Sequence, residues 1–461
     1  LFKLWSTDMI PQTQPPVDEM TTKPTYFIET YGCQMNVADS ELVESILLDE
    51  GYLKAEDIKL ADAIFVNTCA IREQAEEKVH SQLGRYDKIK KKRPSTIIGV
   101  LGCMAQNLKD DLLENKPYVD IVLGPDSYRK LPDILRRKKQ NSTSIVDTKL
   151  SRYEVYENLF PRRKDGVNAW VSIMRGCDKF CTFCIVPFTR GRERSRNLES
   201  IIKEAKEAVN SGYSEITLLG QNVNSYNSNG VKFFNLLEEV ANIDGLKRIR
   251  YTSPHPQDIT EELLLIMAKH KNICNYVHLP VQAGSNRILK RMNRTYTREH
   301  FIDLSKLIRK ILPNVGISTD IIVGFPGETS EEFEETLDLM EQVKFDSAFN
   351  FKYSSRPGTK ASEYDDKIDP IEKKKRLQTV IELQNKHTLE KNKNLIGSVQ
   401  NVLIEKESKL SSNQWAGRTE SNKWVVLDKN EIDINDIIPV KIIDARGVTL
   451  HGELFDKKEA T

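Results

Sequence analysis

The 461-residue chain has few cysteines, almost no net charge and no long apolar run. Seven cysteines are too sparse for a disulfide scaffold and are typical of thiols kept for metal in a reducing compartment, so we expect a cytoplasmic protein. A net charge of +1 gives no overall attraction to nucleic acid, so any RNA binding must come from local patches. No apolar run approaches the roughly 20 residues that cross a bilayer, and we expect no membrane partner.

In the first segment, residues 1–24, we expect no signal peptide, because residues 1–20 have neither a long apolar core nor a small-residue cleavage site. Four prolines in this segment predict an extended tail. The remaining composition, 39% hydrophobic and 29% charged, is that of an ordinary globular protein, and the length predicts about three domains.

Three cysteines occur close together in one short segment, where Cys177, Cys181 and Cys184 form a CxxxCxxC triplet. Three thiolates at this spacing can hold three irons of a 4Fe-4S cube and leave the fourth iron without a protein ligand. A structural zinc needs four ligands, and no fourth Cys or His follows nearby. Three buried structural cysteines are the remaining alternative, but Asp178 and Lys179 between them suit an exposed loop.

Residues 25–148 alternate between apolar runs and helix-like segments, which predicts a doubly wound parallel sheet. The predicted strands are residues 26–30, 63–67, 96–100, 121–123 and 144–146. Cys33, Cys69 and Cys103 each follow one of the first three strands. Because binding crevices form at the carboxyl ends of parallel strands, we expect these cysteines to converge in a second cluster site. Three independent core cysteines are the alternative.

A second alternating series occupies residues 167–394, after an aperiodic segment at 149–166 that is predicted to be a linker. Six strand-like segments separated by helical patterns predict an open, partial TIM barrel of (β/α)6 type, with its active site at the carboxyl ends of the strands. The predicted strands are residues 169–174, 215–219, 248–251, 276–279, 316–323 and 347–353. The CxxxCxxC triplet follows the first of them.

Residues 395–459 change character to short β-type runs separated by polar turns, which predicts a small antiparallel β-barrel. The predicted strands are residues 399–404, 424–427, 440–443 and 448–450. The chain as a whole is therefore predicted to be an α/β protein with three folded domains.

Polar loops follow several of the predicted barrel strands. Gln221 and Asn222 have amide side chains that can hydrogen-bond the amino or carboxylate group of a cofactor, although such residues also simply make turns. Gly324 permits a close approach of the backbone, suitable for an adenine or ribose. His278 lies in an apolar strand and is interpreted as a satisfied core histidine.

The triplet spacing resembles the cluster motif of radical S-adenosylmethionine (SAM) enzymes, and other motifs resemble the radical SAM methylthiotransferases. These motifs are residues 31–36 (YGCQMN), 67–69 (NTC), 102–103 (GC), 189–196 (TRGRERSR), 218–224 (LLGQNVN), 279–282 (LPVQ), 324–328 (GFPGE) and 355–359 (SRPGT). The resemblance extends over residues 25–455, and residues 417–423 (GRTESNK) match the TRAM domain of that family. Residues 186–191 and 291–297 are most similar to the MiaB-type group, which acts on dimethylallyl-adenosine in tRNA.

The resemblance implies two 4Fe-4S clusters, a radical SAM cluster at Cys177, Cys181 and Cys184 and an auxiliary, sulfur-carrying cluster at the other triplet. It implies insertion of a methylthio group at carbon 2 of the isopentenylated adenosine 3' of the anticodon. One SAM would donate the methyl group and a second would yield the 5'-deoxyadenosyl radical. The SAM contacts implied are Gln221, Asn222, Gln282, Asp320 and Gly324.

The expected partners are a tRNA that carries dimethylallyl-adenosine and an external one-electron reductant, and the protein is expected to be a monomer. The arginines nearest the triplet are the preferred candidates for RNA contact, because they adjoin the cluster loop. They are Arg190, Arg192, Arg194 and Arg196. The other basic stretches, at 88–93, 136–139 and 162–164, are more often solvated faces.

Two alternatives remain open at this point. The first keeps the chemistry but changes the substrate to threonylcarbamoyl-adenosine in tRNA or to an aspartate of a ribosomal protein. The second is an electron-transfer or RNA-binding protein whose clusters are only redox or structural groups. Glycine and amide residues at several strand ends favour a bound small cofactor and argue against the second alternative.

Overall fold

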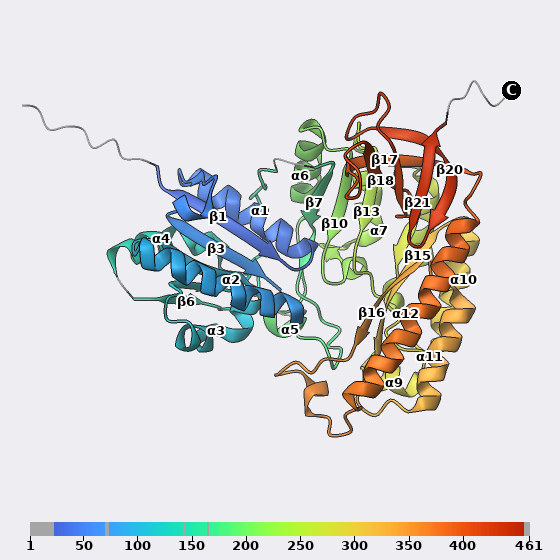
Figure 1. The fold of residues 1–461 in the computed structure, drawn as a ribbon, viewed down its shortest axis with the longest axis horizontal. Coiled ribbons are helices and arrows are strands. Elements are labelled where there is room, and N and C mark those ends of the chain that lie inside the picture. Colours follow the sequence, from blue (N-terminus) through green and yellow to red (C-terminus); the bar gives the residue numbers. More distant parts are fainter. Residues whose placement is uncertain (1–22, 70–72, 142, 164–165, 456–461) are drawn as a thin grey trace, which may run out of the picture.

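The structure, a computed structural model, describes residues 23–69, 73–141, 143–163 and 166–455. The tail predicted for residues 1–24 therefore lies almost wholly outside the described residues. Figure 1 shows an N-terminal lobe in blue, a central lobe in green to orange and a C-terminal barrel in red. Within the described part of the chain, no helix is long and apolar enough to span a membrane.

The N-terminal lobe is built on a parallel sheet with the order β2-β1-β3-β4-β5-β6. Its strands are β1 (Thr25–Tyr31), β2 (Leu53–Lys54), β3 (Ala63–Thr68), β4 (Ile97–Gly102), β5 (Ile121–Leu123) and β6 (Ile145–Asp147). The central strands β3 and β4 are buried at every residue, as expected for near-continuous apolar runs covered on both faces. The prediction is confirmed, and the short edge strand β2 is an addition to it.

Helices cover both faces of this sheet, which makes it doubly wound. They are α1 (Gln34–Asp49), α2 (Glu73–Lys92), α3 (Cys103–Asn115) and α4 (Leu131–Gln140), with the 3-10 turns η1 (Ile58–Leu60) and η2 (Tyr128–Lys130). Apolar residues of α1 and α4 form one core with the sheet, whereas those of α2 and α3 form another. The sheet thus supplies apolar side chains to two separate cores.

The segment predicted to be a linker has no helix or strand in residues 148–163, yet it is packed against the sheet domain. Tyr156 is 3% exposed. Its hydroxyl donates to the carbonyl oxygen of Pro125 at 2.8 Å and accepts from the backbone N–H of Tyr128 at 3.0 Å. These contacts hold the segment in place between the first two lobes.

The central lobe is an open barrel of two three-stranded parallel sheets, β13-β10-β7 and β14-β15-β16, joined by a bridge between Ile249 and Ile273. Its main strands are β7 (Asn168–Ser172), β10 (Glu215–Leu219), β13 (Arg248–Tyr251), β14 (Tyr276–His278), β15 (Gly316–Val323) and β16 (Ser347–Lys352). The smaller pairs are β8 (Met174–Arg175) with β9 (Arg194–Ser195), and β11 (Asn227–Ser228) with β12 (Val231–Lys232).

Helices pack on the outside of this barrel, where the strands present their apolar faces. The helices are α5 (Val186–Thr189), α6 (Leu198–Asn210), α7 (Phe233–Ala241), α8 (Glu261–Lys269), α9 (Asn286–Arg291), α10 (Arg298–Ile311), α11 (Ser330–Val343) and α12 (Pro370–Lys393), with η3 (Val223–Ser225), η4 (Pro256–Asp258) and η5 (Lys360–Glu363). Local caps set their starts: Thr329 and Glu332 form a capping box at α11. The predicted (β/α)6 pattern is confirmed.

The C-terminal lobe is a closed barrel with the order β17-β18-β19-β21-β20. Its strands are β17 (Val399–Glu407), β18 (Gln414–Thr419), β19 (Trp424–Asp428), β20 (Ile437–Arg446) and β21 (Thr449–Leu454). All pairs are antiparallel except β19 with β21, which is parallel. Strand β18 was not among the predicted strands, because its sequence is polar and contains Gly417. A side chain at Gly417 would lie 2.3 Å from the carbonyl oxygen of Leu403, so the close strand pairing needs glycine there.

This C-terminal barrel packs against the amino ends of the central strands through buried charges. Glu215, the first residue of β10, accepts from Arg250 at 2.8 Å and from Arg418 of β18 at 3.0 Å. Arg250 also donates to the carbonyl oxygen of Thr419 at 2.8 Å. Burial raises the pKa of Glu215, but the charges of both arginines outweigh this effect and the pKa lies below its ordinary value. The C-terminal barrel therefore closes the end of the central barrel opposite to the carboxyl ends of its strands.

Candidate active site at two cysteine triplets

The CxxxCxxC segment forms the loop between β8 and α5, at the carboxyl end of the first barrel strand. Gly176 begins it with a φ of +80°, and a side chain there would lie 2.0 Å from the carbonyl oxygen of Arg192. Cys181 is buried, whereas Cys177 and Cys184 are partly exposed. Burial raises the pKa of Cys177 to about 11 and that of Cys184 to about 12, with a further contribution from the neighbouring cysteines.

One arginine contacts this triplet directly. Arg294 donates to Sγ of Cys181 at 3.2 Å, to the hydroxyl of Tyr296 at 2.9 Å and to the carbonyl oxygen of Pro280 at 2.9 Å. Arg294 therefore places a positive charge against one thiol and ties the loop to the end of β14. Residue 294 lies in a motif that the sequence analysis used only for family resemblance.

The second triplet forms where three neighbouring parallel strands end. Cys33 follows β1, Cys69 follows β3, and Cys103 begins α3 directly after β4. Gly32 and Gly102 precede two of them with φ of +135° and +89°. A side chain at Gly32 would lie 2.8 Å from Cβ of Cys69, so glycine is required for this close approach. A hydrogen bond with Cys69 lowers the pKa of Cys33 to about 6.

The two triplets are neighbours in space. Cys103 packs against Ile185, which directly follows Cys184 in the chain. On the same side, Met35 of α1 packs against Leu219 at the end of β10. The N-terminal sheet thus presents its cysteine-bearing edge to the carboxyl ends of the barrel strands.

The donor set of each triplet suits an iron–sulfur cube. Within the described ranges, no group of three His, Cys, Asp or Glu side chains is arranged tightly enough to hold a single metal ion. A cube carries its thiolates on separate irons, so it takes more widely spaced cysteines than one ion does. The thiols of each triplet nevertheless lie near enough to perturb one another's pKa. Three thiols in each set would leave one iron of such a cube without a protein ligand.

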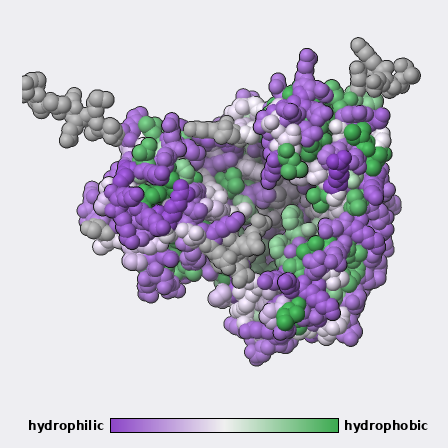
Figure 2. All heavy atoms as spheres, in the orientation of Figure 1, coloured by the Kyte–Doolittle hydropathy of each residue, from purple (hydrophilic) through white to green (hydrophobic). Residues whose placement is uncertain are grey.

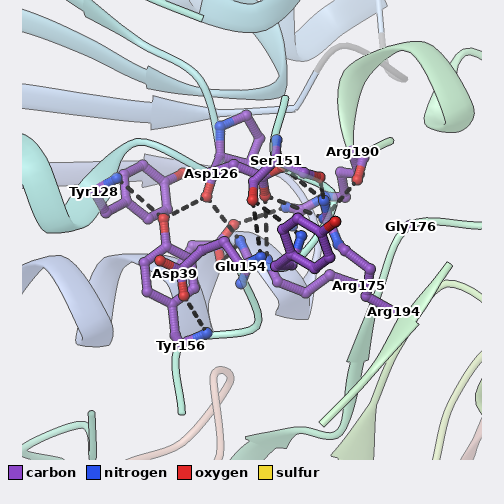
Figure 3. Close-up of polar contacts among 12 residues, drawn as sticks. Asp39, Asp126, Tyr128, Ser151, Glu154, Tyr156, Arg175, Gly176, Arg190 and Arg194 are labelled. Carbon is purple, nitrogen blue, oxygen red and sulfur yellow. Dashed lines mark hydrogen bonds and ion pairs between the residues drawn. The ribbon is translucent and has the colours of Figure 1, made fainter. Parts of the chain in front are cut away.

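Three arginines converge on two buried aspartates between the first two lobes, as Figure 3 shows. Asp39 of α1 accepts from Arg175 at 2.8 Å and from Arg190 at 2.8 Å. Asp126 accepts from Arg194 at 2.9 Å and 3.2 Å. The guanidinium of Arg175 also lies 4.7 Å from the ring centre of the buried Tyr156. We refer to these contacts as the arginine clamp, which is defined by Asp39, Asp126, Arg175, Arg190 and Arg194.

The clamp corrects one prediction, because Arg190, Arg194 and Arg196 are 3%, 8% and 3% exposed and cannot reach RNA. Arg196 pairs with the buried Glu204 instead. Arg192 alone keeps an exposed side chain, which bonds Asp178 at 2.6 Å. The positive run beside the triplet is therefore mainly a structural element that joins two domains.

Asp39, Asp126 and Arg175 were missed by the sequence analysis. Their partners are far away in the chain, since Asp39 and Arg190 are 151 residues apart. In addition, the sequence around a single aspartate in a helix does not indicate that it pairs with a distant arginine. Arg190 was singled out, but for a different role. Its pKa is raised far above the ordinary value by Asp39 and the thiols Cys103 and Cys33, which together outweigh its burial.

Two of the residues predicted to contact SAM, Gln221 and Asn222, lie beside the first triplet. Gln221 accepts the backbone N–H of Gly176 at 2.5 Å, which fixes the start of the cluster loop. Asn222 is buried and donates to Asp258 at 2.9 Å. Beside these loops lies a cavity of about 440 Å³ whose lining includes Lys179, Asn224 and Asp258.

The other three predicted SAM residues lie on the second half of the barrel. Gln282 has a φ of +73° and pairs through its backbone with β15, while Asp320 faces His278 at 3.5 Å. Gly324 has a φ of +66°, but a side chain there would lie 2.4 Å from Cγ of Lys373. The close approach at Gly324 is thus made by α12 of the same chain, which corrects the reason given for this glycine.

The ring of His278 has a hydrogen-bond partner, as expected, in the hydroxyl of Ser318 at 2.8 Å, although His278 lies on the inner face of the barrel.

Comparison with family models identifies three regions of the chain. Residues 171–340 match the radical SAM superfamily, residues 25–124 match the uncharacterized protein family UPF0004, and residues 393–455 match the TRAM domain. The fold and the CxxxCxxC loop thus define a radical SAM protein with two accessory domains.

Relatives that match nearly the whole chain show which family of radical SAM proteins it belongs to. The chain is 47% identical to the tRNA-2-methylthio-N(6)-dimethylallyladenosine synthase of Christiangramia forsetii, with 93% of each chain covered. It is 49% identical to the enzyme of the same name from Parabacteroides distasonis, with 93% of this chain and 94% of the relative covered. The chain belongs to this family of tRNA-2-methylthio-N(6)-dimethylallyladenosine synthases.

Solved structures support the fold at low sequence identity. The radical SAM methyltransferase TsrM from Kitasatospora setae matches with a TM-score of 0.57 and 16% identity, over 74% of this chain and 77% of that one. The cobalamin-dependent SAM radical enzyme OxsB matches with a TM-score of 0.54 and 15% identity, over 79% and 56%. At these identities the likeness concerns the fold alone.

We expect Asp39→Asn to destabilise the protein, because it leaves two buried guanidinium groups without their shared carboxylate. Breaking a buried ion pair by removing one partner costs about 3–5 kcal/mol. Urea unfolding of the metal-free protein measures the loss. Asp133→Asn is the matched control, because Asp133 pairs with Arg136 at the surface and its loss should not change the midpoint. Equal midpoints for the two variants would contradict the clamp.

Proposed function

We propose that the protein inserts a methylthio group at carbon 2 of N6-dimethylallyl-adenosine in tRNA, at the position 3' of the anticodon. The observation that carries this proposal is the contact between Cys103 and Ile185, which places two cysteine triplets side by side. A protein that only generates a radical needs one such triplet. A second triplet at the same site supplies a place for the sulfur that is inserted, and full-length relatives with this activity in their name support the assignment.

Each triplet is proposed to hold one 4Fe-4S cluster, with SAM on the open iron at Cys177, Cys181 and Cys184. When bound, the two clusters and two SAM molecules supply the sulfur, the methyl group and the one-electron route by which carbon 2 exchanges its hydrogen for a methylthio group. Gln221 fixes the start of the loop through Gly176, and the clamp fixes the second triplet relative to the first. The pKa values of Cys177, Cys184 and Cys103 lie above the ordinary value for a thiol, so iron must displace their protons when it binds.

The partners of the proposed reaction follow from its chemistry. The proposed reaction needs an external one-electron reductant. We place it in the cytoplasm, which a tRNA substrate and cysteines kept reduced for metal support. Arg192, with its exposed side chain, and the TRAM barrel are the proposed RNA contacts. We propose that the protein acts as a monomer, since both triplets belong to one chain.

Two tRNAs test the substrate assignment: one carrying the dimethylallyl group and one lacking it. We expect anaerobic incubation of the iron-reconstituted protein with SAM and a reductant to give a methylthio product only from the first. Nucleoside mass spectrometry measures the product. Equal modification of both tRNAs, or of neither, would overturn the assignment, and a threonylcarbamoyl-adenosine tRNA included in the same assay reports the related activity.

Replacement of Cys33, Cys69 and Cys103 together by Ala is expected to remove one of two clusters. SAM cleavage to 5'-deoxyadenosine should continue, because the other triplet is intact, whereas methylthio insertion should be lost. Iron analysis and product analysis measure the two effects. Cys274→Ala is the matched control, since Cys274 is buried away from both triplets beside Arg250. Unchanged iron content in the triple variant would refute the proposal of a second cluster.

Arg294→Gln is expected to shift the reduction potential of the cluster at the first triplet to a more negative value. The substitution removes a positive charge and a hydrogen bond to Cys181, and such bonds to ligating sulfur favour the reduced cluster. A bond that is stronger by about 1.5 kcal/mol to the reduced than to the oxidised cluster corresponds to a shift on the order of 60 mV for one electron. Redox titration followed by EPR measures the shift. Arg287→Gln, at the surface pair with Glu332, is the control and should leave the potential unchanged.

A further inference from the structure

The two faces of the sheet β14-β15-β16 differ in chemistry. Register pairs place Val277, Ile317 and Thr319 on one face and His278, Ser318 and their neighbours on the other. The first face packs under helices in the main core. The second faces the inside of the open barrel, and Figure 2 shows that the molecule is hollowed between the N-terminal lobe and the lobe that contains β16. This inner face therefore remains accessible from the open side of the barrel.

Two large apolar side chains lie on this inner face without being covered. Phe349 is 54% exposed and Phe351 is 41% exposed, and both belong to β16, the last strand in the sheet order. The register pairs them with Asp320 and Ile322 of β15, which confirms that they share the inner face. Exposed neighbouring phenylalanines inside a barrel, rather than on its helical exterior, mark an interaction surface.

Phe349 is held in a defined position by polar neighbours. Its ring lies perpendicular to that of His278, with 5.9 Å between the ring centres. His278 is fixed in turn by Ser318 at 2.8 Å and faces Asp320 at 3.5 Å. Because His278 contacts Phe349 in an edge-to-face arrangement, one face of the phenyl ring is left free for a planar ligand.

Phe351 lies on the strand next to β15, which is hydrogen-bonded to the segment that Arg294 ties to the first triplet. Its partner Ile322 donates its backbone N–H to the carbonyl oxygen of Gln282 at 2.9 Å. Two residues earlier, Pro280 accepts from Arg294, which contacts Cys181. The two phenylalanines therefore line the wall of the barrel that adjoins the cluster loop.

Positive charge gathers at the carboxyl end of β16, although the register pairs Lys352 with Val323 and so places it on the face of the sheet opposite to Phe351. Lys352 follows Phe351, and its charge acts on Lys373 of α12 together with that of Lys367. Burial and these two charges lower the pKa of Lys373. In the segment between β16 and α12, the carboxylate of Asp366 is paired with Arg291. Exposed aromatic rings with lysines at the end of the same strand can bind single-stranded RNA through stacked bases and phosphates.

We propose that Phe349 and Phe351 form the surface on which the substrate adenosine lies, with its base against the rings and its dimethylallyl group in contact with them. This inference rests on the proposed function, since it names the group that the same site would recognise. The branched apolar group has no polar atom to satisfy, so it gains by covering exposed phenyl carbon. An adenosine without the group leaves those rings exposed to water.

The test uses the iron-reconstituted protein and two anticodon stem-loops, one with and one without the dimethylallyl group on the adenosine. Binding of each RNA is measured for the wild type, Phe349→Ala, Phe351→Ala and the double variant. We expect the wild type to prefer the modified RNA. Each Ala variant should weaken binding of the modified RNA by roughly tenfold, as loss of one stacking contact does, and reduce the preference. Leu265→Ala, at a 53% exposed residue on the barrel exterior, is the control and should bind both RNAs as the wild type does.

A second measurement separates this surface from a SAM site. Cleavage of SAM to 5'-deoxyadenosine without RNA should proceed in the Phe variants at the wild-type rate and with an unchanged KM for SAM. A raised KM for SAM with unaltered RNA preference would overturn the inference, as would full preference in the double variant. Failure of the wild type to modify dimethylallyl tRNA would instead refute the proposed function, and this inference would fall with it.

Discussion

The arrangement of the active site depends on the ion pairs that the carboxylate of Asp39 forms with two arginines. Asp39 lies on α1, in the domain that carries one triplet, and accepts from Arg175 and Arg190, which flank the loop of the other triplet. All three groups are nearly free of solvent, so their attraction is weakly screened. A flexible connection between the domains would leave the distance between the triplets undefined. The arginine clamp instead holds the two domains together, so that both triplets belong to one site.

The central barrel is closed at one end and open along one side. Buried charges around Glu215 attach the TRAM barrel to the amino ends of the strands. The N-terminal sheet covers part of the carboxyl ends through Met35 and Leu219. Between β16 and the N-terminal lobe the inner face stays uncovered, where Phe349 and Phe351 lie. The inner face of the barrel is therefore open on the side of β16.

Local patterns were sufficient to predict the three folded regions and both cysteine triplets. Cys33, Cys69 and Cys103 were predictable as a set, because each follows an apolar strand and parallel strands end at one edge. The clamp was not predictable, since Arg194 pairs with Asp126 across 68 residues and arginines beside a cluster loop also suit RNA. Strand β18 was missed because its polar sequence becomes a strand only by pairing with β17 and β19. Gly324 showed the same limit: a close approach to its backbone was expected, but an approach by Lys373 was not.

The central claim is that two iron–sulfur clusters occupy neighbouring triplets in one rigid site. Anomalous diffraction at the iron edge, from crystals of the anaerobically reconstituted protein, tests it most directly. We expect iron density at both triplets, in adjacent positions on either side of the contact between Cys103 and Ile185, with Asp39 bound to both arginines. Iron at only one triplet, or two clusters separated by a displaced N-terminal domain, would contradict it.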